Sequence, residues 1–87
     1  MGEIIILCEN KNLISKETFR DVEKLKKELE KNNLDDKFFS IYVRPTDNKK
    51  IVILAIGKLN KNDDIETSQI FLFKDKNDIE SIIRKLN

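Results

Sequence analysis

Catalysis needs reactive side chains at suitable spacing, and this sequence offers one candidate nucleophile. Cys8 is the only cysteine, and the chain contains no histidine that could act as its general base. It ends an apolar stretch that we expect to be a strand, close before an expected helix whose N-terminus could lower the thiol pKa. A lone cysteine is also among the most buried residue types. A thiol-dependent enzyme centred on Cys8 is therefore only a second alternative, and the sequence favours a protein that is not an enzyme.

Side-chain oxygens at Asn60, Asn62 and Asp64 have the first, third and fifth spacing of a calcium-binding loop. The position that such a loop reserves for glycine is Ile65, and its final glutamate position is Phe71, so a specific site of this kind is excluded. Phosphate-binding loops rich in glycine are excluded too, because the chain has only two glycines. We therefore expect no metal ion and no cofactor.

Aromatic and basic side chains come together in an expected strand at residues 38–44 and in the turn that follows it. Phe38, Tyr42 and Arg44 share one face of an alternating strand, and Lys49 and Lys50 follow in the turn. Aromatic rings on an open sheet flanked by cations can stack the bases of a single strand. Seventeen basic residues nearly cancel sixteen acidic ones, however, so no long-range field attracts a polyanion. Single-stranded nucleic-acid binding is thus the first alternative and is not favoured.

The strands that must position these residues are recognisable from their apolar runs. Residues 51–56 form the longest run without a polar side chain, which predicts a central strand covered on both faces. Residues 4–7 predict a second interior strand, and residues 69–73 predict a fourth strand that is apolar on both faces. The polar residues 58–66 are expected to form a loop.

Two amphipathic segments predict helices. The first has an apolar stripe and begins at Ser15 or Thr18, either of which can cap it. The second begins at Asp75 or Asn77, and the spacing of Asn77 and Glu80 favours Asn77 as its cap. The stripes consist of Phe19, Val22, Leu25 and Leu29 in the first helix and of Ile79, Ile82, Ile83 and Leu86 in the second.

The element order is therefore β-α-β-β-β-α, which predicts a single α+β domain over residues 1–87 with a four-stranded mixed sheet. A right-handed crossover would make the first strand parallel to a neighbour, and the last three strands read as an antiparallel meander. The pattern leaves the strand order open. Two layers, with both helices on one face, are favoured over three layers with one helix on each face.

A two-layer arrangement would leave an apolar sheet face without a cover. Such a face is larger than a soluble monomer usually tolerates, so we expect a small binding or regulatory module that forms a homodimer or binds another protein. The residues that we assign to this interaction face are Phe38, Tyr42, Val52 and Leu54. A single cysteine permits no internal disulfide, and no apolar run is long enough to span a membrane, so we expect a cytoplasmic protein without a membrane partner.

Overall fold

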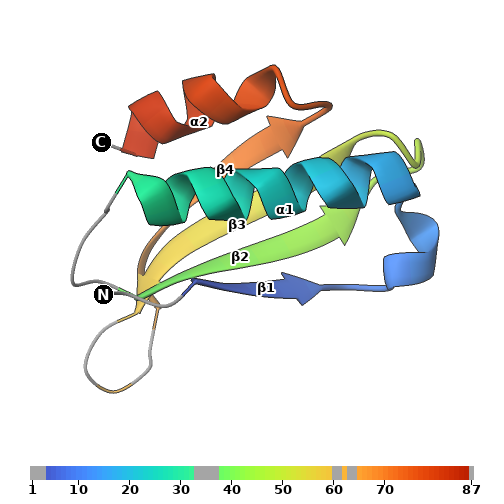
Figure 1. Cartoon of the computed structure of the whole chain (residues 1–87). Helices are drawn as coiled ribbons and strands as arrows, with labels where there is room; N and C mark the ends of the chain where they lie inside the picture. The colour runs from blue at the N-terminus through green and yellow to red at the C-terminus, as the bar shows by residue number, and fades with distance from the viewer. Residues whose placement is uncertain (1–3, 33–37, 60–61, 63–64, 87) are drawn as a thin grey trace.

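The computed structural model describes residues 4–32, 38–59, 62 and 65–86, with only the backbone described at residues 38, 39, 58, 59 and 65–67. The predicted order of elements is confirmed (Figure 1). A short 3-10 turn, η1, is added between the first strand and the first helix. The elements are β1 (Ile4–Cys8), η1 (Lys11–Leu13), α1 (Lys16–Lys31), β2 (Phe38–Pro45), β3 (Val52–Leu59), β4 (Ile65–Phe73) and α2 (Asp78–Leu86).

The four strands form one mixed sheet in the order β1-β2-β3-β4. β1 is parallel to β2, while β2, β3 and β4 form the predicted antiparallel meander. The prediction that residues 4–7 form an interior strand is wrong, because β1 lies at the edge of the sheet. The crossover through α1 places β1 beside β2, and the β2–β3 hairpin occupies the other side of β2.

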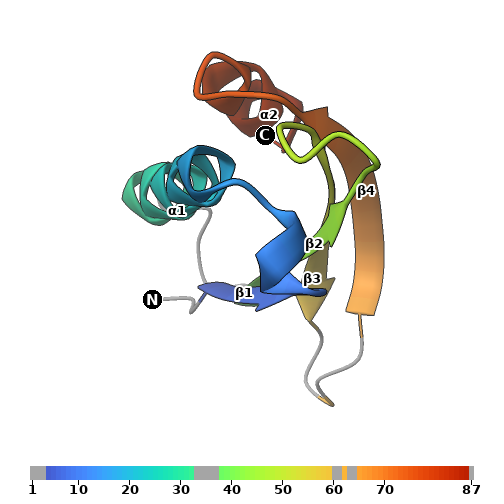
Figure 2. The same ribbon diagram turned by 90° about the vertical axis from the view of Figure 1, so that its right-hand side faces the viewer.

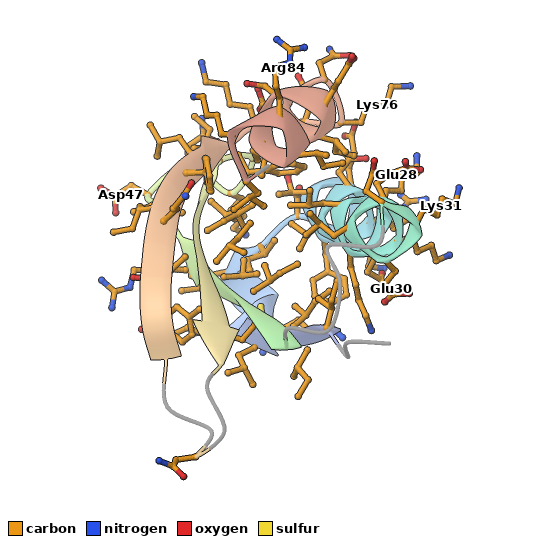
Figure 3. All side chains as sticks on the ribbon, turned by 90° about the vertical axis from the view of Figure 1, so that its left-hand side faces the viewer. Glu28, Glu30, Lys31, Asp47, Lys76 and Arg84 are labelled. Atoms are coloured by element: carbon orange, nitrogen blue, oxygen red, sulfur yellow. The ribbon has the colours of Figure 1, made fainter. Side chains whose placement is uncertain are left out.

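Both helices lie on the same face of the sheet, so the protein has two layers (Figure 2). Side chains fill the space between the sheet and the helices (Figure 3). The core is one cluster, and its largest fully buried members come from α1 and the three neighbouring strands β2, β3 and β4. They are Val22, Leu25, Leu29, Ile41, Val43, Val52, Leu54, Ile56 and Phe73.

The expectation that residues 51–56 are covered on both faces is therefore wrong. β3 is interior to the sheet, but the helices cover only one of its faces. The predicted loop at residues 58–66 is shorter than expected, because β3 continues to Leu59 and β4 begins at Ile65, with a register shift at Lys58 and Leu59. Backbone hydrogen bonds hold this part of the hairpin, and they do not depend on apolar side chains.

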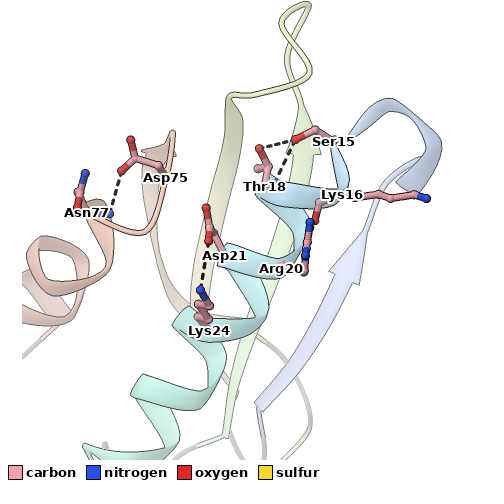
Figure 4. A network of polar contacts seen from close by, with 8 residues as sticks. All are labelled: Ser15, Lys16, Thr18, Arg20, Asp21, Lys24, Asp75 and Asn77. Atoms are coloured by element: carbon pink, nitrogen blue, oxygen red, sulfur yellow. Dashed lines mark hydrogen bonds and ion pairs between the residues drawn. The ribbon is translucent and has the colours of Figure 1, made fainter.

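Ser15 caps α1, which decides between the two predicted caps. Its Oγ accepts a hydrogen bond from the Thr18 amide at 3.1 Å and donates to Thr18 Oγ1 at 2.8 Å (Figure 4). Thr18 Oγ1 in turn donates to the Lys50 carbonyl at 3.3 Å, and the Ser15 amide donates to the Lys49 carbonyl at 3.1 Å. The same bonds that start the helix therefore fix it against the β2–β3 hairpin.

Asp75 fulfils the capping role before α2, in place of the favoured Asn77. Its Oδ1 accepts a hydrogen bond from the Asn77 amide at 2.8 Å (Figure 4). Asp78 reaches back, and its Oδ2 accepts from the Lys74 amide at 2.8 Å and from the Asp75 amide at 3.3 Å. Because two carboxylates satisfy the amides that precede the helix, α2 can turn sharply back over the sheet after β4.

Candidate functional site

The sheet face turned away from the helices receives side chains from all four strands. The strand register places Leu7, Tyr42, Ala55 and Ile70 in one row across the sheet. In the next row, Arg44 lies opposite Ile53, and Ile53 lies opposite Leu72. We call this surface the open face and define it by Ile5, Leu7, Glu9, Ser40, Tyr42, Arg44, Ile53, Ala55, Ile70 and Leu72.

Large apolar side chains are concentrated on the open face. Five of the six that are exposed among the described residues lie there, and the sixth, Leu13, lies in η1. The exposed fractions on the open face are 72% for Ile70, 64% for Leu72, 51% for Leu7, 44% for Ile5 and 37% for Tyr42. Single exposed hydrophobic residues are ordinary on protein surfaces, while the largest group of them on one face is often functional.

The four residues predicted for the interaction face do not all lie on it. Tyr42 does, while Val52 and Leu54 are fully buried beneath the helices, and assigning them to an exposed face is wrong. Side chains alternate along a strand, so Ile53 and Ala55 occupy the open face in their place. Phe38 belongs to β2, but its side chain lies outside what the structure describes.

A polar cluster of Glu9, Tyr42 and Arg44 lies within the apolar surface. The Tyr42 hydroxyl donates to Glu9 Oε2 at 2.7 Å, and Arg44 Nε donates to the same oxygen at 3.2 Å. The Glu9 amide donates to the Val43 carbonyl at 2.9 Å, which extends the parallel pairing of β1 and places the carboxylate over β2. The cluster thus joins the edge strand to its neighbour.

The contacts within this cluster shift the pKa of each member. The hydrogen bond from Tyr42, followed by that from Arg44, holds the pKa of Glu9 below its ordinary value. The same carboxylate raises the pKa of Tyr42 and that of Arg44, since it stabilises the protonated form of each. Sequence reasoning missed Glu9, although it follows Ile5 and Leu7 at a spacing of two and so continues their face of the strand.

The residues predicted for nucleic-acid binding are brought only partly together. Tyr42 and Arg44 are neighbours on the open face, but Glu9 pairs with both and places a negative charge between them. Lys49 and Lys50 are exposed in the β2–β3 hairpin, whose carbonyl groups bond to the start of α1. Because Glu9 neutralises Arg44, these two residues add no net positive charge beside the ring, and nucleic-acid binding stays an alternative prediction.

Cys8 lies on the helix-covered side of β1 and packs, half-buried, against the core. Burial raises the pKa of its thiol, an effect that the positive charge of Lys11 opposes only in part. The thiol is therefore protonated at neutral pH and weakly nucleophilic.

A hollow between the starts of α1 and α2 brings together charged side chains of both signs (Figure 4). Asp21 is buried there, and Lys24 Nζ lies 4.0 Å from its Oδ1. The seven lining residues include three acids and three bases, so the hollow has no net preference for an anion or a cation. They are Glu17, Arg20, Asp21, Lys24, Asp75, Lys76 and Asn77.

No cluster of three or more metal-ligating side chains occurs in the part of the chain that the structure describes. Of the three residues with calcium-loop spacing, Asn60 and Asp64 lie outside the described residues. Within the same described ranges, neither helix has the length and apolar composition to cross a bilayer. Comparison with protein-family models, curated proteins and solved structures found no match to this chain.

Proposed function

We propose that this chain is a non-enzymatic interaction module that associates through its open face with another apolar protein surface. The observation that supports this proposal is the exposure of Ile5, Leu7, Tyr42, Ile70 and Leu72 on one side of a single sheet. The reducing environment of the cytoplasm forms part of the proposal, because the only cysteine packs against the core.

The size of the exposed surface can be compared with the cost of association. The exposed fractions of these five side chains correspond to roughly 500 Å² of surface on one protomer. At about 25 cal/mol per Å², removing that surface from water contributes on the order of 12 kcal/mol. The loss of translational and rotational freedom costs about 4–15 kcal/mol, so the gain from covering this surface is of the same size as the cost of association.

The chemistry of the polar side chains supports binding over catalysis. The thiol of Cys8 has a raised pKa, which disfavours the nucleophilic thiolate. Glu9 has a lowered pKa and is hydrogen-bonded to Tyr42 and Arg44, which makes it a poor general acid at neutral pH. Glu9 is better suited to joining β1 to β2 than to moving a proton.

A matched pair of leucine substitutions tests the proposal. Leu72→Lys places a charge on the open face, while Leu13→Lys makes the same change at an exposed leucine of η1. The wild-type protein should either associate or bind an environment-sensitive apolar dye, and Leu72→Lys should weaken both properties while Leu13→Lys retains them. Circular dichroism checks that each variant is folded. A wild-type protein that neither associates nor binds the dye would contradict the proposal.

A further inference from the structure

We infer that the partner of the open face is a second copy of this chain, with the two sheets packed face to face about a two-fold axis. This inference rests on the proposed function and specifies its partner. The area of the open face, its charge and its shape each support it.

The area approaches the lower limit for a stable dimer. Two copies would bury about 1,000 Å² from the five exposed apolar side chains alone, close to the lower limit of about 1,200 Å² for a standard interface. Ile53 and Ala55 are half-buried between them on the same face and add to this area. A second copy is therefore large enough to cover the surface without any additional segment.

The charges on the open face are complementary to an identical face. A two-fold axis brings residue i of one copy against residue j of the other, and j against i. Glu9 and Arg44 supply one carboxylate and one guanidinium to this surface, and they already neutralise each other at 3.2 Å. The bond uses Nε of Arg44, and the side chain of Arg44 remains 61% exposed, so its guanidinium is accessible to a partner. The formal net charge of +1 adds little repulsion between copies.

The shape of the sheet also suits a second identical sheet. The sheet curls around the helices, so the open face lies on the outside of the curve (Figure 2). The most exposed side chains, Ile70 and Leu72, belong to β4 at one edge, and Leu7 belongs to β1 at the other. Two such faces approach most closely at their centres, where Ala55 is small. The larger side chains then fill the space that opens toward the edges, at the usual separation of about 10 Å between packed sheets.

Sedimentation velocity on the wild-type chain tests the inference. Over a range from about 1 to about 100 µM, the mass should rise from that of one chain to that of two. Leu72→Lys should raise the dimer dissociation constant at least about tenfold, because it places a charge in the apolar contact, while Leu13→Lys should change it by less than about twofold. If Leu72→Lys does not fold, Leu72→Ala gives a smaller increase at the same position.

Three results would overturn the inference, and they have different consequences for the proposed function. A monomer at all concentrations that binds the apolar dye at the open face overturns self-association alone. A monomer that does not bind the dye overturns both proposals. A dimer that is unaffected by Leu72→Lys, and in which the outer amides of β4 are protected from hydrogen exchange, would show pairing edge to edge and overturn face-to-face packing.

Discussion

Tyr42 is the residue on which the polar and apolar parts of the open face meet. Its ring lies among the exposed aliphatic side chains, and its hydroxyl donates to the Glu9 carboxylate. Because the folded state raises the pKa of Tyr42, this contact stabilises the fold below the ordinary phenol pKa and is lost as the pH rises through the raised value. For Glu9 the sign is opposite, and its contribution is lost as the pH falls through the lowered pKa.

We predict that Glu9→Gln lowers the pKa of Tyr42 toward its ordinary value, because the largest cause of the upward shift is the hydrogen bond to this carboxylate. Tyrosinate absorbance measures this pKa directly, since Tyr42 is the only tyrosine and the chain has no tryptophan. Arg44→Gln is the control and should raise the pKa of Tyr42, because it removes a positive charge that lowers this pKa. An unchanged titration in Glu9→Gln would show that the contact is absent in solution.

The N-cap of α1 gives a second prediction for a single residue. Ser15→Ala should lower the free energy of unfolding by about 1 kcal/mol, because the Thr18 amide loses its side-chain acceptor and the Thr18 hydroxyl loses its donor. Urea denaturation measures the change. Ser81→Ala is the matched control, since Ser81 is exposed within α2, and it should change the unfolding free energy by less than about 0.5 kcal/mol. Equal effects of the two substitutions would argue against a capping role for Ser15.

At the scale of elements, the two faces of the sheet should respond differently to the same substitution. Leu54 on β3 is fully buried beneath the helices, while Leu72 on β4 is 64% exposed on the open face. We predict that Leu54→Ala lowers the free energy of unfolding by about 2–5 kcal/mol, because it leaves a cavity in the core. Leu72→Ala should lower it by less than about 1 kcal/mol when unfolding is measured at protein concentrations that favour the monomer. Similar losses would mean that the open face is covered within one chain.

The sequence pattern was sufficient to predict the element order, the meander and the apolar character of β3. It could not assign the two sides of a strand that is apolar at every position. Val52 and Leu54 alternate with Ile53 and Ala55, and only the three-dimensional position of the helices decides which pair is buried. An alternating strand such as β2 carries this information in its polar positions, which is why Tyr42 was placed correctly on the open face.

The missed residue and the misplaced edge strand have a common cause. The pairing partner of β1 is distant in sequence, and no local pattern specified that β1 lies beside β2 alone. With the parallel register known, Glu9 continues β1 toward Arg44, and the polar cluster follows. Without the register, the spacing of two from Ile5 and Leu7 does not show where β1 ends, and Glu9 reads as the start of a polar connection.

At the scale of the whole molecule, the two-layer arrangement makes the folding stability of the chain depend on whether its open face is covered. A chain of 87 residues buries a small fraction of its surface compared with larger domains, and here one sheet face contributes nothing to the core of a single chain. A second copy on the open face would bind the folded chain and not the unfolded one, so it would shift the folding equilibrium by mass action.

We therefore predict that the thermal midpoint of the wild-type chain rises with protein concentration. Above the dimer dissociation constant, each tenfold increase adds about 0.7 kcal/mol per protomer, or about 3–5 °C for a domain of this size. Differential scanning calorimetry over two decades of concentration measures the slope. Leu72→Lys should reduce this slope, because its dimer forms only at higher concentration, while Leu13→Lys should keep the wild-type slope, since Leu13 lies outside the open face. High salt should not reduce the slope, because apolar contacts, unlike surface ion pairs, are not screened. A wild-type midpoint that is constant over this range would mean that the open face does not pair with itself.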